Sequence, residues 1–571
     1  MRIQSIQIQK FRSIDNTTIF FKQFLALVGA NNVGKSHVLR ALNAFFNYQD
    51  ERESFLNEAH LYSKQSRPRI TVTFSDIVPE DKIDKEYIYN QRLTIKFTYR
   101  WDRKNPTYEV IVGVEKKAID LDTFNRLTKC FSYVYIPIIR NYDAAFRSDS
   151  GIAYKLLCKI FSQQTANRNN LQPAADRLIK KVEDSIYQPA MKKLKQYYPF
   201  SKGQSFVMET YHADVIDLIL RNVTLKLVED SQENGIDNCG SGIQSAVFFA
   251  ISLAISMCNG CTYLVGIEEP ELNMHPQAQR QLIEALKEKG RYPHTQFVVT
   301  THSTVIIDRL GHDSIALCRK TKGQKRDIIT TVTQIGEDFW NRYQMEEERY
   351  YNFFDFKNSD FFFSNYIIIT ESTNDCKVVQ HLLEISRIDT EALGISLIPA
   401  SGERSVKYPY AIAKELGIPF ICIVDRDVFQ QYINDKREIS LNDDGLPIYK
   451  PSLKNGSPIL DLIGETDKST LLEALNNDQY IKALEILRRY NIISMRYAFE
   501  VDLVVCKSYC AAFCAQLKVR EGDKNIAYLL KKQGKVIKNY MNINNVLDEK
   551  GTQNLPKSYR QILNVVKEMI Q

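Results

Sequence analysis

A glycine-rich loop occupies residues 29–36 and reads GANNVGKS. It fits the pattern G-x-x-x-x-G-K-[ST], and it lies between the strand-like stretch LALV and the helical stretch HVLRALNAFF, as the pattern requires. The backbone N–H groups of such a loop surround phosphates at the positive end of the helix. Lys35 would reach the β- and γ-phosphates of a nucleotide, and Ser36 would hold Mg²⁺. The candidate nucleotide-binding residues of this loop are Gly29, Asn31, Asn32, Gly34, Lys35 and Ser36.

Two glutamates, Glu268 and Glu269, follow a second strand-like stretch, TYLVGI. Beside a phosphate-binding loop, the first carboxylate would hold Mg²⁺ through water, and the second would orient or deprotonate the attacking water. A solvated acidic turn is the alternative. A third stretch, QFVVTTHS, contains His302 near its end. This histidine could sense the γ-phosphate, but a lone histidine is more often structural.

A second glycine-rich segment, CGSGIQS, opens the long apolar stretch SAVFFAISLAIS. A helix that starts with glycines can bind phosphate, although glycines at helix starts are common for other reasons. The candidate phosphate-binding residues here are Ser241, Gly242 and Gln244.

A separate set of carboxylates lies far from the first loop. Asp425 and Asp427 follow the apolar run FICIV, and in an extended chain both would point to the same side. Glu371 follows another apolar run, YIIIT, with Asp375 four residues later. The ends of parallel strands converge on one crevice, so these acids can meet there. A divalent metal would best balance the charge of these clustered carboxylates, and two Mg²⁺ ions would position water for attack on a phosphodiester. The alternative is that Asp425 and Asp427 only cap or solvate the end of a strand.

The elements that position these residues form two α/β patterns. Strand-like stretches dominate the first 110 residues, and strands alternate with helices from 240 to 310 and again from residue 365. Helical periodicity and many charges mark residues 150–230, which we read as an inserted arm. The segment before residue 365 is rich in Phe and Tyr, as expected of a packed connection. The predicted parts are 1–150, 151–230, 231–345, 346–364 and 365–571.

Composition is that of a globular protein of several domains, with 571 residues, 44% hydrophobic and 25% charged residues. A net charge of +7 permits an anionic partner without requiring one. No run of 18 apolar residues occurs, so we expect no membrane span. Eleven cysteines without a framework indicate a reducing, cytoplasmic location.

The order of these motifs resembles the ABC-type ATPase heads of the SMC and recombination proteins. FRSI, NNVGKS, GSGIQ, EEPELNMHP and VVTTHS resemble their first strand, Walker A, signature, Walker B with D-loop, and H-loop. Two departures are the reduced signature GSGIQ and Glu268 in place of the usual aspartate, which is compatible with slow ATP turnover. The resemblance implies ATP with Mg²⁺, bound between two subunits, so that Gly242 of one copy faces Lys35 of another.

Glu371 with Asp375, followed by Asp425 and Asp427, resembles the Toprim domain. A head followed by a Toprim domain is similar to the OLD (overcoming lysogenization defect) nuclease family, whose members act in antiphage defence. The resemblance implies an α/β fold: an ABC ATPase head with a helical dimerisation insertion, then a Rossmann-like Toprim domain with a helical C-terminal region.

The same resemblance implies further site residues. Glu500 matches a later metal-binding acid, and a C-terminal lysine contacts the scissile phosphate, for which we favour Lys535 over Lys531 and Lys532. Ser372 stands where the family usually has glycine. Residues 517–540 carry seven Lys or Arg against two acids, typical either of a DNA-backbone contact or of a solvated helix face.

The leading hypothesis is therefore an ATP-regulated endonuclease or nickase that uses Mg²⁺ or Mn²⁺ and acts on DNA. The alternative is an ATP-driven DNA sensor or scaffold with a weak Toprim site, working with a companion protein or nucleic acid. A topoisomerase component ranks lower, because no winged-helix domain with a nucleophilic tyrosine is evident.

Overall fold

The structure is a computed structural model of the chain. It describes residues 1–137, 157–158, 160, 165–190, 192, 223, 226–229, 232–257, 262–288, 295–323, 328–345 and 359–570. Contacts divide the chain into two compact units. The first comprises Met1–Leu27, Asn32–Arg309 and Arg319–Val332, and the second comprises Val28–Asn31, Leu310–Cys318 and Thr333–Gln571.

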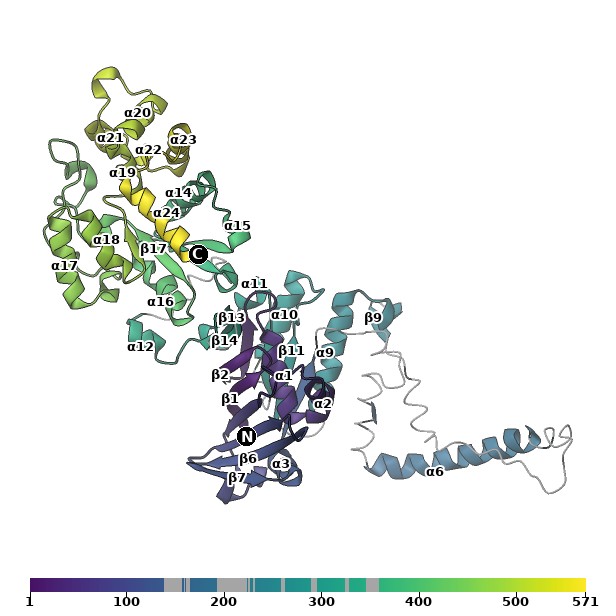
Figure 1. Ribbon diagram of the computed structural model, residues 1–571. Coiled ribbons are helices and arrows are strands. Elements are labelled where there is room, and N and C mark those ends of the chain that lie inside the picture. The colour runs from purple at the N-terminus through teal and green to yellow at the C-terminus, as the bar shows by residue number, and fades with distance from the viewer. Residues whose placement is uncertain are drawn as a thin grey trace. The chain divides into compact units, whose positions relative to one another are not determined.

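Twelve strands, most of them within the first unit, form one mixed sheet in the order β7-β6-β5-β4-β1-β2-β14-β13-β3-β12-β11-β8 (Figure 1). The strands are β1 Arg2–Phe11, β2 Ile14–Phe20, β3 Phe24–Val28, β4 Arg69–Ser75, β5 Leu93–Arg100, β6 Asn105–Val112, β7 Glu115–Ile119, β8 Phe131–Ile136, β11 Thr262–Glu268, β12 Thr295–Thr300, β13 Ile315–Thr321 and β14 Ile329–Gln334.

The sheet has two halves with different sequence patterns. In the antiparallel half, buried and half-buried residues alternate along β5, as in a strand with one face on the core. In the parallel half, β3 and β12 are buried at every position, because both of their faces are covered. The predicted strands of the first 110 residues are confirmed.

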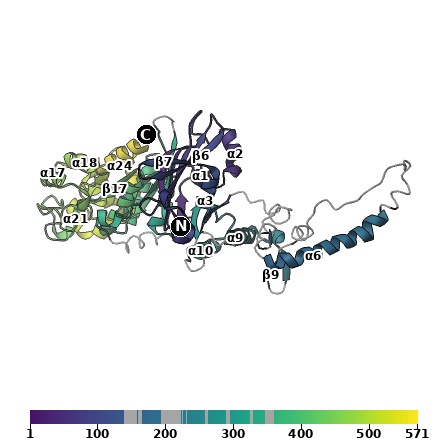
Figure 2. The same cartoon turned by 90° about the horizontal axis from the view of Figure 1, so that it is seen from below.

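Helices of the first unit follow the strands that carry its motifs. They are α1 Lys35–Phe46, α2 Tyr48–Leu56, α3 Leu121–Thr128, α9 Ser241–Met257, α10 Pro276–Lys287 and α11 Thr304–Ile307. In the predicted inserted arm, the described residues include α6 (Thr165–Val182), which continues as π-helix over Glu183–Tyr187, and β9 (Lys226–Glu229). β9 pairs with β10 (Gln232–Gly235), which lies just after the predicted arm. Figure 2 shows α6 as one continuous helix. The remainder of the arm lies outside the described residues.

The second unit contains a parallel sheet of four strands in the order β16-β15-β17-β18. Its strands are β15 Tyr366–Thr370, β16 Ile395–Pro399, β17 Phe420–Val424 and β18 Ile492–Ser494. Its helices are α12 Phe339–Tyr343, α14 Thr373–Ile385, α15 Thr390–Leu393, α16 Lys407–Glu415, α17 Glu465–Asn476, α18 Tyr480–Arg488, α19 Phe499–Val505, α20 Lys507–Gln516, α21 Ile526–Lys532, α22 Gly534–Ile537, α23 Tyr540–Lys550 and α24 Lys557–Ile570.

The predicted second α/β pattern and the helical C-terminal region are therefore confirmed. β15 and β17 pair directly, so the residues after Thr370 and Val424 emerge at the same edge of the sheet. The C-terminal helices pack on this sheet through an apolar core that includes Ile368, Leu529 and Tyr559. Among the described residues, no helix is long and apolar enough to cross a membrane.

Candidate functional site

The glycine-rich loop adopts backbone conformations that its residue types permit. Gly29 has φ 137°, Asn32 has φ 60°, and Gly34 has φ 101°, all in the region that favours glycine or asparagine. Gly34 is the residue before α1, and a Cβ there would lie 2.4 Å from Oγ1 of Thr330. The loop therefore turns directly into a helix that begins at Lys35.

Lys35 and His302 are in direct contact. Nζ of Lys35 lies 2.6 Å from Nε2 of His302, and the lysine is only 6% exposed. Burial and the lysine charge lower the pKa of His302 to about 4. The imidazole is therefore neutral at pH 7, and Nε2 accepts the hydrogen bond that the Lys35 ammonium donates.

The two glutamates at the end of β11 take different positions. Glu268 ends the strand and is buried, whereas Glu269 has φ 42° and lies outside it. The Glu269 amide donates to the carbonyl of Thr300 at 3.0 Å, and its carboxylate Oε1 lies 3.8 Å from Nε2 of His302. The predicted lysine, second glutamate and histidine thus meet at one place.

Glu271 is a residue of this site that the sequence did not single out. Its Oε1 accepts hydrogen bonds from the hydroxyl of Thr301 and from the amide of His302, both at 2.8 Å. The carboxylate therefore fixes the loop that carries the histidine. Its place three residues after Glu268, in EEPEL, was the available signal.

The second glycine-rich segment forms the start of α9. Ser241 is the first residue of this helix and Gly242 the second. A Cβ on Gly242 would lie 3.1 Å from the carbonyl oxygen of Asn273, so this position packs tightly against the segment after β11. Nε2 of Gln244 donates to the carbonyl of Ile236 at 3.1 Å.

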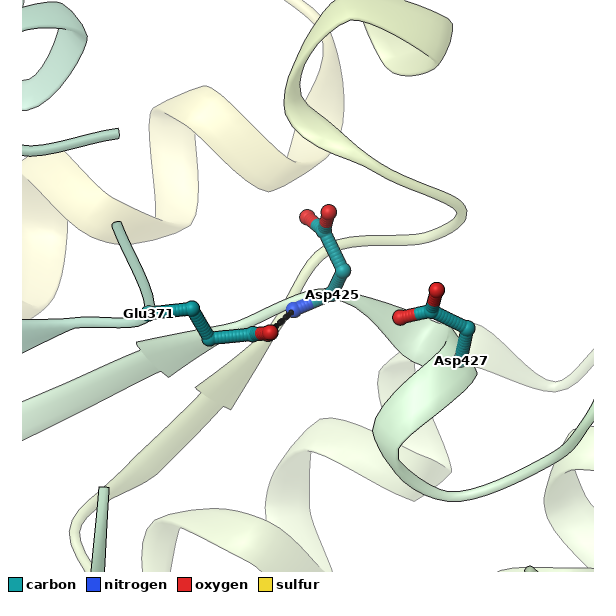
Figure 3. A group of neighbouring side chains, drawn as sticks. All are labelled: Glu371, Asp425 and Asp427. Atoms are coloured by element: carbon teal, nitrogen blue, oxygen red, sulfur yellow. Dashed lines mark hydrogen bonds between the residues drawn. The ribbon is translucent and has the colours of Figure 1, made fainter. Parts of the chain in front are cut away.

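Three carboxylates of the second unit converge at the end of its sheet (Figure 3). Glu371 follows β15 and Asp425 follows β17, and one oxygen from each of these and from Asp427 all lie within 4.8 Å of one another. The backbone amide of Asp425 donates to Oε1 of Glu371 at 2.7 Å. The predicted meeting of these acids is present in the structure.

The way in which Asp427 reaches the cluster differs from the prediction. We expected Asp425 and Asp427 to share one side of an extended strand, but β17 ends at Val424 and residues 426–428 form a 3-10 turn. β18, which pairs with β17, ends at Ser494 beside Val424, and the Arg426 amide donates to the carbonyl of Tyr497 at 2.9 Å. The turn brings the Asp427 carboxylate toward Asp425, as Figure 3 shows.

Electrostatics of the cluster favour a cation. Burial raises the pKa of Glu371 to about 8, and the neighbouring Asp427 and Asp375 act in the same direction. Burial and the same neighbours raise the pKa of Asp425 well above its ordinary value. Oδ1 of Asp425 is buried and accepts no hydrogen bond from the described residues. An all-oxygen donor set with an unsatisfied buried oxygen fits a divalent ion such as Mg²⁺.

Two further predicted ligands lie beside this group and are engaged elsewhere. Asp375 forms a capping box with Ser372 at the start of α14, with Ser372 Oγ donating to Oδ2 at 2.7 Å. Glu500 forms an ion pair with Arg437. Neither contributes an oxygen to the described group, and their assignment as metal ligands stays a prediction.

Lysines from two distant segments approach the acids. Lys535 and Lys538, on and after α22, line a cavity of about 510 Å³ together with Asp427 and Lys454. The charges of Lys454 and Lys538 oppose the rise in the pKa of Asp427 caused by burial. Lys454 also pairs with Glu403. Sequence reasoning selected Lys535 and missed Lys454 and Lys538, because spacing cannot show which lysine of a basic segment faces inward.

Comparisons with known proteins agree with this architecture. The sequence profile of the AAA ATPase domain matches residues 1–307. The profile of the overcoming lysogenization defect protein-like TOPRIM domain matches residues 362–427, which include the three clustered acids.

Three curated relatives are nucleases. The chain is 28% identical to the OLD nuclease of Thermus scotoductus over 34% of this chain and 36% of the relative. It is 22% identical to the Old nuclease of Escherichia phage P2 over 75% of this chain and 77% of the relative. It is 23% identical to the endonuclease GajA of Bacillus cereus strain HuB5-5 over 45% of this chain and 37% of the relative. The matches thus span little more than a third of the Thermus and Bacillus proteins.

The predicted order of an ATPase head and a Toprim domain is confirmed, and these two domains imply the use of a nucleotide and a divalent metal. The chain belongs to the AAA ATPase domain family and carries, after that domain, a TOPRIM domain of the OLD type.

Proposed function

We propose that the protein is an ATP-regulated DNA endonuclease or nickase, dependent on Mg²⁺ or Mn²⁺, that acts in antiphage defence. The observation that carries the proposal is the cluster of Glu371, Asp425 and Asp427, with oxygens within 4.8 Å and a buried Asp425 oxygen that lacks a hydrogen bond from the described residues. Three relatives that match parts of this chain bear the names of nucleases.

At the Toprim site, two metal ions would bind. Glu371, Asp425 and Asp427 would be their main ligands, and Asp375 and Glu500 would supply further carboxylate oxygens. Bound metal supplies a nucleophilic water and stabilises charge on the phosphate and leaving oxygen. Lys538 is our choice for the contact to the scissile phosphate, since its charge acts on Asp375, Asp425 and Asp427, with Lys535 further along the same strand of DNA.

At the ATPase site, Lys35 and the loop of Gly29, Asn31, Asn32 and Gly34 would bind the phosphates. Ser36 and Glu268 would hold Mg²⁺. Glu269 would orient or deprotonate the attacking water. His302, whose Nε2 lies 3.8 Å from the Glu269 carboxylate, would lie near the γ-phosphate. The family's use of two subunits assigns Ser241, Gly242 and Gln244 to the nucleotide of a second copy.

A homodimer is part of the proposal. On α6, Leu171 and Leu178 are seven residues apart, and they are 47% and 50% exposed. Apolar residues at this spacing lie on one side of a helix and are typical of a seam between two helices. The arm of residues 151–230 would then carry a contact between copies. In this division of the chain, the ATPase parts are 1–150 and 231–345, the connection is 346–364, and the Toprim part is 365–571.

The test uses supercoiled plasmid with Mg²⁺ or Mn²⁺, with and without ATP. We expect nicked or linear product from the wild type and none from Asp427→Ala, while ATP hydrolysis persists in that variant and is lost in Lys35→Ala. The nuclease proposal would be overturned if wild type and Asp427→Ala both left the plasmid intact in every condition, including added phage DNA. That result would favour a DNA sensor or scaffold.

A further inference from the structure

A cavity beside the acid cluster has the character of a nucleic-acid contact. Its volume of about 510 Å³ lies within the range of ordinary ligand pockets. Five cationic side chains line it against three carboxylates, one of which is Asp427. Its lining also includes Tyr432, an aromatic residue that has no place in the proposed metal chemistry.

Tyr432 belongs to an ordered aromatic stack. Tyr432 and Tyr449 lie opposite one another in a small antiparallel ladder, which the hydrogen bonds Ile433 N to Ile448 O and Lys450 N to Gln431 O hold together. Their ring centroids are 5.0 Å apart and the ring planes are inclined by 26°. The pair is therefore stacked face to face rather than edge to face.

Arg426 lies against the same stack. Its guanidinium carbon is 4.4 Å from the centroid of the Tyr449 ring. Arg426 and Tyr432 therefore both pack against the Tyr449 ring. Hydrogen bonds fix Arg426 in turn. Its Nη2 donates to Oε1 of Gln430 and to the carbonyl oxygen of Leu475, both at 2.9 Å.

This arrangement ties the tyrosine to the acids. Arg426 is the residue between Asp425 and Asp427, so the stack begins within the backbone segment that presents two of the three clustered carboxylates. Tyr449 covers one side of the Tyr432 ring, and Tyr432 itself remains half-buried and reaches the cavity that Asp427 lines. The ring is thus a rigid apolar surface at a fixed place next to the acid cluster.

We infer that Tyr432 is a stacking platform for one base of the DNA strand whose phosphate lies at the acid cluster. The inference rests on the proposed nuclease function. Within a duplex, each base is already stacked on its neighbours, so a base can reach a tyrosine only when it is unpaired or extruded. The favoured substrate therefore has an unpaired base next to the cleaved bond, with Lys454, Lys535 and Lys538 along its phosphates.

A binding measurement tests the platform without cleavage. DNA carrying 2-aminopurine at each nucleotide flanking the mapped cut is mixed with full-length protein in Ca²⁺. We expect quenching at one position by wild type and by Tyr432→Phe, which keeps the ring, and its loss in Tyr432→Leu. Tyr89→Leu, which removes a half-exposed tyrosine from the first unit, is the matched control and should quench normally.

A cleavage measurement tests the substrate preference. We expect kcat/KM on a duplex with an unpaired base at the cut to exceed that on the perfect duplex, and Tyr432→Leu to lower it roughly 5- to 100-fold, the range that one lost base stack gives. An abasic site at the quenched position should reduce wild type to the level of Tyr432→Leu.

Three results would overturn the inference: equal quenching and cleavage by Tyr432→Leu and wild type, no effect of the abasic site on wild type, or equal cleavage of perfect and unpaired substrates. The abasic series needs only wild-type protein, so it decides the matter even where Tyr432→Leu folds poorly. If any of these three results is found and Asp427→Ala still abolishes cleavage, the inference about Tyr432 is wrong while the proposed nuclease function stands.

Discussion

The backbone amide of Asp425 donates a 2.7 Å hydrogen bond to Oε1 of Glu371, which joins the ends of β15 and β17 through the two acids themselves. The bond orients the glutamate without neutralising it. A glutamine at position 371 would keep the acceptor, whereas an alanine would lose it. Structure and charge at this position can therefore be separated by mutation.

We expect Glu371→Gln and Glu371→Ala both to lower cleavage by at least about 100-fold, since each removes a carboxylate that we propose as a metal ligand. In EDTA at pH 7, Glu371→Gln should unfold at a higher temperature than wild type, because the neutral glutamine avoids the cost of protonating a buried carboxyl on folding and keeps the hydrogen bond, a gain on the order of 1–3 kcal/mol. Glu371→Ala should unfold at a lower temperature. Calorimetry checks both, and equal destabilisation by the two variants would contradict this role of the hydrogen bond.

The acid cluster predicts a specific dependence of stability on pH. Because the folded-state pKa of Glu371 is about 8, above the 4.5 of an ordinary glutamate, the free energy of unfolding in EDTA should fall as pH rises through that interval. The slope per such group is at most about 1.4 kcal/mol per pH unit. Divalent metal competes with these protons, so the rise in Tm caused by Mg²⁺ or Mn²⁺ should be larger at pH 8 than at pH 6.

Differential scanning calorimetry at several pH values measures this slope. Asp427→Asn, which removes one carboxylate of the cluster and keeps its size, should show both a shallower slope and a smaller effect of metal. A metal-induced rise in Tm that is the same at pH 6 and pH 8 would show that metal does not bind these acids.

The lysines near the acids should differ in importance. We expect Lys538→Ala to reduce plasmid cleavage roughly 100-fold and Lys535→Ala about 10-fold or less, because a charged hydrogen bond at the scissile phosphate strengthens in the transition state. Lys531→Ala, on the neighbouring α21, is the control and should cleave normally. Should Lys535→Ala prove the more damaging variant, the phosphate contact would return to the residue favoured from sequence.

The ATPase site offers a test of binding against turnover. Glu269→Gln should bind ATP with near-normal affinity and hydrolyse it at least about 100-fold more slowly, as expected when a carboxylate that orients water is lost. Lys35→Ala should lose binding. Fluorescent-nucleotide titration and phosphate release separate the two effects, and normal turnover by Glu269→Gln would remove this residue from the mechanism.

Much of the architecture could be predicted because the site residues terminate strongly apolar strands. YIIIT, FICIV and TYLVGI are buried stretches whose limits are visible in sequence, so the positions of Glu371, Asp425 and Glu268 followed from the rule that parallel strands end at one edge. The glycine-rich loop could also be identified, because it follows the apolar strand FLALV.

Other parts of the site depend on tertiary contacts that spacing does not encode. Lys454 and Lys538 reach Asp427 from segments 27 and 111 residues away along the chain, and their direction depends on how the C-terminal helices pack. A 3-10 turn carries Asp427 where we expected an extended chain, and both strands that pair with β17 end beside its last two residues. Tyr432 and Tyr449 are two tyrosines among 31, and only the ladder between them makes them a pair.

Ser372 stands where the resemblance to the OLD family implies glycine, directly after Glu371, the first of the proposed metal ligands. Here its hydroxyl accepts the amide of Asp375 and donates to the Asp375 carboxylate, so it starts α14 as an ordinary helix cap. Serine and glycine are both accepted at that position of a helix. For genome surveys, a search pattern that demands glycine after the glutamate would therefore overlook chains like this one, whereas a pattern that admits any small capping residue would recover them.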